Sequence, residues 1–382
     1  MKSVLKKLLP MLMLTSQLVP VHAVENSVSP PANVPDKPSI ILKAEPTNQS
    51  LAGRLRNADL WASYKSRFIS DKGRVIDTAN AQISHSEGQG YGMLLAVAAA
   101  DRNAFDRIWG WTRANLMVRD DQLIAWRWEP NNRPAVADMN NASDGDLLIA
   151  WALTEAAEFW NDAALRLSAQ RLASEVGRKL ILTSSKYGPL ILPAIAGFSN
   201  DERPDGPVVN LSYWVFPAFD RLALVSPEID WAGLKMSGVA LVKEARFGSA
   251  KLPTEWISVH GDEVKPAEQF PQQFSYNSIR IPLYLAWAGL NARELYEGFA
   301  GLWANSKSAQ VASVDVVTGR SLQPMAEPGY STVAALTLCV VNGTPMPRDL
   351  NISRPGENYY PATLHLMSLL AVEMRYQSCL RA

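Results

Sequence analysis

The chain has 382 residues, and its 37 lysine and arginine residues balance its 37 aspartate and glutamate residues, so the formal net charge is zero. No stripe of basic residues runs through it, which argues against nucleic acid or an anionic membrane as the main partner, because both require clustered positive charge. A neutral substrate is favoured.

The first residues have the pattern of a secretory signal peptide. A basic start is followed by the apolar run 8–19 and by small residues at Val21 and Ala23. A membrane anchor needs about 20 apolar residues, and this run is interrupted at Pro10. We expect residues 1–23 to be removed, leaving a mature chain without a membrane span in the periplasm or outside the cell.

The rest of the chain divides once by composition. Residues 24–50 are rich in Pro, Ser and Asn without an apolar period and are interpreted as a linker. Residues 51–382 carry nearly all the aromatic residues and are expected to form one domain. Cys339 and Cys379 are interpreted as either a disulfide or two buried thiols. The four histidines lack metal-ligand spacing, so neither a metal site nor a cofactor is expected.

Apolar residues return every three or four positions in most of the domain, which predicts helices. The predicted helices cover 51–68, 91–116, 144–160, 163–182, 212–225, 230–245, 278–289, 292–303, 331–341 and 360–376. Strand-like alternation is rare, and 186–194 and 310–315 are the best candidates for strands. The domain is therefore predicted to be all-α, either a helical solenoid or a closed helical barrel.

Polar residues gather just before several predicted helices, at 86–88, 141–143, 210–212 and 276–277. If the helices alternate in direction around a ring, these starts converge on one end. A cleft at that end would be an active site.

Two acidic segments stand out among these helix starts. Residues 84–93 read Ser-His-Ser-Glu-Gly-Gln-Gly-Tyr-Gly-Met, where the glycines allow tight turns and close approach to a ligand beside Glu87. Residues 142–153 place Asp144 and Asp146 at the head of an apolar helix. Ordinary helix capping accounts for single acids in such positions, but two in three residues suggest that one points into a site.

The two segments resemble glycoside hydrolase family 8. Residues 142–160, Ala-Ser-Asp-Gly-Asp-x-x-Ile-Ala-x-Ala-Leu-x-x-Ala-x-x-x-Trp, resemble the family signature, and 86–93 resemble its proton-donor segment. Asn-Leu-Ser-Tyr at 210–213 and Tyr-Tyr at 359–360 also resemble the endoglucanases that accompany bacterial cellulose synthase. Thr154 departs mildly from the pattern. The likeness spans roughly residues 55–375.

The resemblance implies an (α/α)6 barrel with a long substrate groove at one end, hydrolysing β-1,4-glucan with inversion. By position, Glu87 would be the general acid and Asp144 would hold the sugar at the cleavage point. The glycosidic oxygen is a poor leaving group, so Glu87 must be protonated near neutral pH. A helix start disfavours that form, so burial or a neighbour such as Asp144 must favour it.

The expected base is absent. The family pattern supplies an Asp in Tyr-Asp-Ala-x-Arg, whereas residues 276–280 read Tyr-Asn-Ser-Ile-Arg. Asn277 can position water but cannot take its proton. Either another acid is the base, or the enzyme is slow, or the chain is an inactivated variant that holds an intact oligosaccharide. The candidate bases are Asp262, Glu263, Glu268 and Asp144.

Aromatic side chains are expected to stack on the sugar rings. Those in loops or at helix starts near the acidic segments are the predicted platforms: Trp126, Trp128, Tyr213 and Trp214. Tyr276 and Arg280 are further candidates, Arg280 as the partner of an active-site carboxylate. Tryptophans at core-like helical spacing are interpreted as packing residues, namely Trp109, Trp111, Trp151, Trp160 and Trp287.

The leading hypothesis is an endo-β-1,4-glucanase that trims or releases glucan, with the polymer and a cellulose synthase complex as partners. The alternatives are a glucan-binding protein that has lost hydrolysis, and a hydrolase of another β-1,4 polysaccharide such as xylan or chitosan. A helical scaffold for protein partners does not account for the acidic segments.

Overall fold

The computed structural model describes residues 41–44, 50–183, 185–304 and 311–380. The expected signal peptide, 1–23, and most of the expected linker, 24–50, lie outside the described residues. Among the described helices, none is both long and apolar enough to cross a bilayer.

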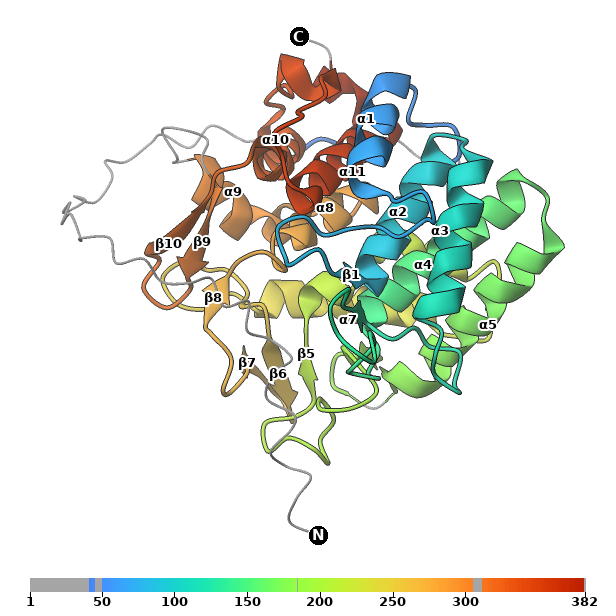
Figure 1. Cartoon of the computed structure of the whole chain (residues 1–382). Helices are drawn as coiled ribbons and strands as arrows, with labels where there is room; N and C mark the ends of the chain where they lie inside the picture. The colour runs from blue at the N-terminus through green and yellow to red at the C-terminus, as the bar shows by residue number, and fades with distance from the viewer. Residues whose placement is uncertain (1–40, 45–49, 184, 305–310, 381–382) are drawn as a thin grey trace. The chain divides into compact units, whose positions relative to one another are not determined.

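Helices dominate the described residues, as the sequence predicts (Figure 1). The α-helices are α1 (Ala58–Phe68), α2 (Ser86–Ala98), α3 (Arg102–Asn115), α4 (Ser143–Phe159), α5 (Ala163–Leu180), α6 (Phe216–Leu222), α7 (Trp231–Glu244), α8 (Arg280–Trp287), α9 (Glu297–Ala304), α10 (Pro328–Asn342) and α11 (Tyr359–Arg375). Each predicted helical segment overlaps at least one of them. The segment 91–116 differs by containing parts of two, because Ala100 adopts a left-handed conformation and Asp101 caps α3.

Short 3-10 turns interrupt or extend several segments: η1 (Leu211–Tyr213), η2 (Arg293–Leu295), η3 (Arg348–Asn351) and η4 (Gln377–Leu380). η1 precedes α6, so the predicted helix over 212–225 is a 3-10 turn followed by a short α-helix. Pro217 in the first turn of α6 fits a new helix start, where its missing N–H leaves no bond unmade.

Strands are more numerous in the described residues than the sequence indicates. They are β1 (Ser84–His85), β2 (Arg127–Trp128), β3 (Ile181–Leu182), β4 (Leu190–Ile191), β5 (Val208–Val209), β6 (Ile257–His260), β7 (Glu263–Pro266), β8 (Gln273–Phe274), β9 (Val311–Asp315) and β10 (Ser321–Met325). They pair antiparallel as β1–β2, β3–β4, β5–β6–β7 and β8–β9–β10. In Figure 1, β5 to β8 lie below α1, α2, α10 and α11.

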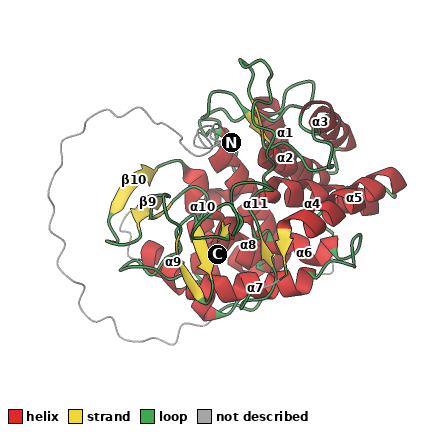
Figure 2. Ribbon diagram, turned by 90° about the horizontal axis from the view of Figure 1, so that it is seen from below, coloured by secondary structure: helices red, strands yellow, loops and turns green. Residues whose placement is uncertain are grey.

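Burial separates the helices into an inner and an outer set. Every residue of α2 except Glu87 is buried, and α4 is exposed only near its end. Such all-round burial is typical of a helix inside a helical layer. By contrast, α1, α3 and α5 bury one stripe each. Contacts run from α2 to α4, α6, α8 and α11 and back to α2, so the inner helices close a ring (Figure 2).

The two sets also begin differently. The starts of α1, α3, α5 and α7 are capped by the side chains of Asn57, Asp101, Asp162 and Asp230. Of the inner helices, α2 is capped by His85, whereas the residues before α4, α6, α8 and α11 make no side-chain cap hydrogen bond. The polar residues at the inner starts are therefore available for contacts with one another.

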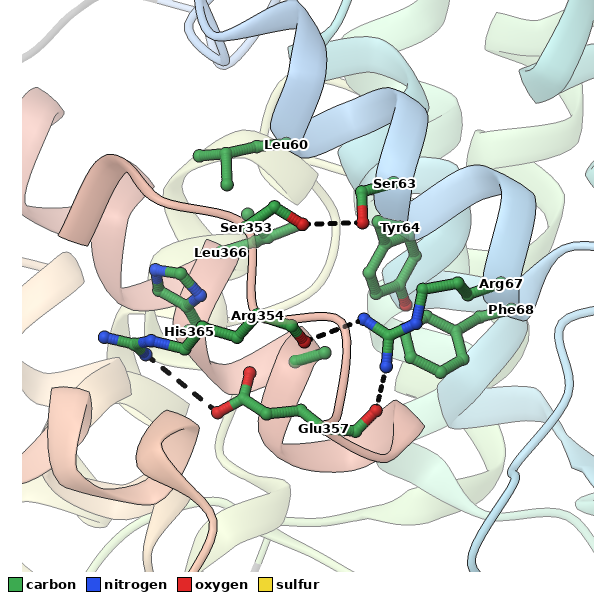
Figure 3. A pocket seen from close by; sticks show the side chains of 11 residues that line it. Leu60, Ser63, Tyr64, Arg67, Phe68, Ser353, Arg354, Glu357, His365 and Leu366 are labelled. Atoms are coloured by element: carbon green, nitrogen blue, oxygen red, sulfur yellow. Dashed lines mark hydrogen bonds and ion pairs between the residues drawn. The ribbon is translucent and has the colours of Figure 1, made fainter. Parts of the chain in front are cut away.

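The first and last helices meet at a cavity of about 20 Å³ (Figure 3). Tyr64 of α1 and Thr363 of α11 share a hydrogen bond of 2.9 Å across the seam. Beside it, Arg67 donates to the backbone oxygens of Arg354 and Glu357. No predicted site residue lines this cavity, which lies between α1 and α11.

The two cysteines form a disulfide. Cys339 in α10 is bonded to Cys379 in η4, with the Cα atoms 6.1 Å apart. Of the two alternatives that the sequence leaves open, the structure has the bridge.

Candidate active site

Glu87 lies in the first turn of α2, and 18% of its side chain is exposed. The sequence places residues 86–88 ahead of the helix, but they form its first turn because His85 takes the capping position. Nδ1 of His85 accepts a hydrogen bond of 3.0 Å from the Gly88 N–H. Burial alone would lower the pKa of His85, but Asp77 and Glu87 outweigh it and raise that pKa.

The glycines around Glu87 form no tight turns, so that expectation is wrong. They lie within α2, where they allow close packing. A Cβ on Gly90 would stand 2.6 Å from Cβ of Leu148 in α4, and one on Gly92 would stand 2.7 Å from Val75. Because the glycines let α2 pack closely against its neighbours, they fix the direction in which the Glu87 side chain points from the helix.

Asp144 and Asp146 lie in the first turn of α4 and have different surroundings. Asp146 accepts hydrogen bonds from the Ile124 N–H and the Asn141 side chain, so it ties a loop to the helix. Asp144 is 1% exposed, and its carboxylate pairs with Arg280. Burial raises the pKa of Asp144 to about 6, with Arg280 opposing the rise, and raises the pKa of Asp146 to about 7.

Arg280, the first residue of α8, joins the inner helix starts. Its Nη1 lies 2.9 Å from Oε2 of Glu87 and 2.9 Å from Oδ2 of Asp144. Its Nη2 donates to Oγ of Ser212 and to Oδ1 of Asn277, each at 3.0 Å. The predicted convergence of the helix starts is confirmed, and so is the pairing of Arg280 with carboxylates.

Asn277 stands in the turn before α8 and is held from two sides. Its Oδ1 accepts from Arg280, and its backbone N–H donates to Oε1 of Glu255 at 2.8 Å. Tyr276 is half-buried beside it, and the hydroxyl of Tyr360 donates to the Tyr276 carbonyl. Asn277 therefore lies at the centre of the site. Its amide oxygen is not basic.

Sequence reasoning missed Glu255. The residue is 9% exposed and precedes β6 by two positions. Burial raises its pKa, and hydrogen bonds from Asn277 and the charge of Arg280 oppose the rise. The only local signal is an acid between Pro253 and Trp256, which does not reveal contact with a residue 22 positions further on.

Three of the candidate bases lie away from this contact network. Asp262 and Glu263 are exposed at the turn between β6 and β7, and Glu268 is exposed after β7. The backbone N–H of Glu268 donates to Asp205, which anchors the loop. These positions indicate that all three are solvated surface acids. The geometry therefore does not support the prediction of a base among them.

Two predicted platforms lie on the segment that pairs with the residues just before Glu87. Strand β2 pairs with β1, placing Trp128 opposite Ser84, and the Trp126 carbonyl accepts from the Ser86 N–H at 3.0 Å. Both tryptophans are half-buried. The Trp126 indole donates to Asp138. Their role in sugar binding stays a prediction.

Of the other two, Tyr213 is half-buried and its ring lies 5.6 Å from the Arg280 guanidinium carbon. Trp214 is fully buried and its indole N–H donates to the Leu234 carbonyl. Trp214 cannot stack on a sugar, so that prediction is wrong. Loop position alone misleads here because the side chain turns into the core against Gly238.

The tryptophans interpreted as packing residues lie in ring contacts. Trp151 packs edge-on against Trp287, and both are almost fully buried. Trp109 is also buried, and half-buried Trp160 contacts Phe105. Trp111 is half-buried and packs edge-on against Trp128, so it supports a predicted platform.

Comparison with known proteins decides the family. The model of glycosyl hydrolases family 8 matches residues 45–374. The chain belongs to this family. A probable endoglucanase from Novacetimonas hansenii is 35% identical over 319 residues, covering 82% of this chain and 90% of the relative.

Solved structures of endoglucanases show the same architecture. Endo-β-1,4-glucanase CMCax from Acetobacter xylinum superposes with a TM-score of 0.74 at 33% identity, covering 82% of this chain and 97% of that one. Endoglucanase Cel10 from Klebsiella pneumoniae gives 0.73 at 34% identity, covering 82% and 98%. The (α/α)6 barrel that the resemblance implies is confirmed, whereas the groove stays a prediction.

Within this family 8 barrel the charges are arranged asymmetrically. Glu87 is the partly exposed carboxylate, and Asp144 and Arg280 beside it are almost completely buried. A buried guanidinium between two carboxylates limits their repulsion and fixes their geometry. The site can thus present one acid to a ligand while Asp144 is held in place. In the described part of the chain, no His, Cys, Asp or Glu side chains form a group suited to a metal ion.

Proposed function

We propose that the protein is an endo-β-1,4-glucanase that hydrolyses cellulose-like glucan with inversion, Glu87 being the general acid. The observation that carries the proposal is the meeting of Glu87 and Asp144 on Nη1 of Arg280, at the end of the ring where the inner helices begin. The endoglucanases among its relatives support the choice of glucan.

Each residue has a defined part in this reaction. Glu87 donates its proton to the glycosidic oxygen as the bond to the sugar breaks. Asp144, held by Arg280 and by the Gly145 N–H, accepts hydrogen bonds from sugar hydroxyls at the cleavage point. Trp126, Trp128 and Tyr213 provide stacking surfaces for neighbouring rings.

The decisive assay measures reducing ends released from carboxymethyl cellulose. We expect Glu87→Gln to lower kcat by about 10²- to 10⁴-fold, the usual contribution of a general acid. Glu297→Gln is the matched control, because Glu297 also lies in the first turn of a helix but pairs with Arg246. Proton NMR of the first product should show the α-anomer; a β-anomer contradicts inversion.

Asn277 favours a second candidate function, a glucan-binding protein without hydrolysis. Its amide occupies the place where the family pattern has a base. Calorimetric binding of cello-oligosaccharides without release of reducing ends would support this candidate. Release from xylan or chitosan but not from glucan would instead support a hydrolase of another β-1,4 polysaccharide.

We further propose that the protein works outside the cytoplasm, in the periplasm or secreted, and takes part in cellulose synthesis beside a synthase complex. The signal-like residues 1–23 and the Cys339–Cys379 disulfide support export, because such bridges persist in oxidising compartments. Cell fractionation with N-terminal sequencing tests the location, and a chain that keeps residues 1–23 in the cytoplasm contradicts it. Co-purification with the synthase tests the partner.

A further inference from the structure

An inverting glycosidase needs a base that takes a proton from the attacking water on the face opposite the acid. Asn277 cannot do this, because an amide oxygen is not basic at any useful pH. Another carboxylate must therefore be the base, and its identification rests on the proposed hydrolysis of glucan.

Asp144 is too close to the acid for this role. Its Oδ2 and Oε2 of Glu87 both lie 2.9 Å from the same nitrogen of Arg280, so they are at most twice that distance apart. Inverting glycosidases separate acid and base by roughly 6.5 to 9.5 Å to leave room for water. Asp144 therefore lies on the same side of the cleavage point as Glu87, not on the side of the base.

Glu255 contacts Asn277 through the Asn277 backbone. Its Oε1 accepts the Asn277 N–H at 2.8 Å, while Oδ1 of Asn277 accepts from Arg280. The Asn277 amide group thus turns its oxygen toward Arg280 and its NH₂ away from it. Burial raises the pKa of Tyr213, and the charges of Asp144, Glu87 and Glu255 raise it further, so Tyr213 feels all three carboxylates.

The backbone around Glu255 is firmly held. Its N–H donates to the Gln273 carbonyl at 3.0 Å. The neighbouring Trp256 ring is stacked between Phe198, at 5.3 Å, and Phe270, at 5.0 Å. Tyr213 meets the edge of Trp256 at 6.1 Å. A base must be rigidly placed relative to the water it activates, and this packing provides that placement.

We propose that Glu255 is the catalytic base and that Asn277 orients the attacking water. The water oxygen bonds to the anomeric carbon, and one water proton passes to the Glu255 carboxylate. The bond from that carbon to the glycosidic oxygen breaks, and that oxygen takes the proton of Glu87. Glu255 then releases its proton to solvent and Glu87 regains one, so one water is consumed per bond.

An uncharged residue at position 277 suits this assignment. An aspartate there would place a second negative charge next to Glu255 and would favour the protonated form of the pair. Asn277 keeps the hydrogen bond to Arg280 without adding charge. Burial raises the pKa of Glu255 above its ordinary value, which makes the carboxylate a stronger base.

The test compares the wild type with Glu255→Gln on soluble cello-oligosaccharides. Glutamine keeps an acceptor for the Asn277 N–H, so the fold and the affinity for glucan should persist. We expect kcat to fall by about 100-fold or more and the acidic limb of the kcat/KM profile to disappear. Sodium azide, a nucleophile that needs no deprotonation, should restore turnover and yield a glycosyl azide. Glu263→Gln is the matched control and should retain activity within twofold.

Two more variants keep the test decisive. Adding Asn277→Asp to Glu255→Gln should recover at least tenfold, because it returns a carboxylate beside the water. If Glu255→Gln does not fold, Glu255→Asp should lower kcat while keeping the acidic limb. An active wild type with an unimpaired Glu255→Gln variant overturns the base assignment alone. Loss of activity that neither azide nor Asn277→Asp reverses assigns Glu255 a positioning role and also overturns it. A wild type that cleaves no glucan overturns the proposed function as well.

Discussion

Gly145 of α4 lies so close to Ser86 of α2 that a Cβ on Gly145 would stand 2.1 Å from Oγ of Ser86. The same Cβ would stand 2.8 Å from the backbone nitrogen of Glu87. The two acidic segments therefore meet backbone to backbone, and the glycine between the two aspartates sets the position of the acid.

Gly145→Ala is expected to displace the first turn of α2 and with it Glu87. A displacement of about 1 Å at a reacting group costs on the order of 10²-fold in rate. We expect kcat on carboxymethyl cellulose to fall by that order. Gly110→Ala is the control, because a Cβ there meets nothing within 4 Å. Equal activity of the two variants would contradict this account of Gly145.

Arg280→Lys is expected to disrupt the site although it keeps the positive charge. The fork of Arg280 serves Glu87, Asp144, Ser212 and Asn277 at once, and a lysine ammonium cannot reach all four in this geometry. Since hydrogen bonds to charged groups contribute about 1.5–3 kcal/mol each, we expect a loss of stability of about 3 kcal/mol and a lower kcat. Urea unfolding with kinetics measures both, and unchanged stability would contradict the network.

Asp146 should make stability depend on pH. Burial raises its pKa to about 7 in the folded state, whereas the unfolded value is about 3.9. The folded state therefore holds this proton more tightly. The resulting stabilisation is complete below the unfolded pKa and is lost as pH rises toward 7.

The comparison with Asp146→Asn isolates this effect, because asparagine does not titrate. The free energy of unfolding of the wild type relative to the variant should fall between pH 4 and pH 7. The fall is about 1.4 kcal/mol for each unit of the pKa rise. Urea unfolding across this range measures it, and parallel profiles for the two proteins would refute the prediction.

The disulfide should stabilise the packing of η4 against α10. Bridging Cys339 and Cys379 closes a loop with a sequence separation of 40, for which about 2–4 kcal/mol is typical. The double variant Cys339→Ala/Cys379→Ala should lose that much in urea unfolding. Dithiothreitol should destabilise the wild type and leave the variant unchanged; an equal response of both would show that the bridge contributes nothing.

The sequence predicts the features that depend on local pattern. Helical periodicity located the helices, and the positions of Glu87, Asp144 and Arg280 at helix starts predicted that they would meet. Their meeting follows from alternating helices in a ring, so a local pattern was sufficient.

The features that the sequence did not reveal depend on contacts between distant segments. Glu255 reaches the site only because the β5–β6–β7 sheet folds its loop against the turn of Asn277. Two-residue strands such as β1 have no pattern of their own and exist because a partner lies opposite. Trp214 looks like any loop aromatic until its neighbours in the core are known.

The seam between Tyr64 and Thr363 has a consequence for how the protein forms. The two residues are 299 positions apart, and the ring is closed only when α11 packs against α2 and α8. Contacts so distant in sequence are slow to form, and inner helices without their neighbours expose apolar surface on all sides. Glu87 is therefore synthesised early, but the site around it is complete only after nearly the whole chain has been made.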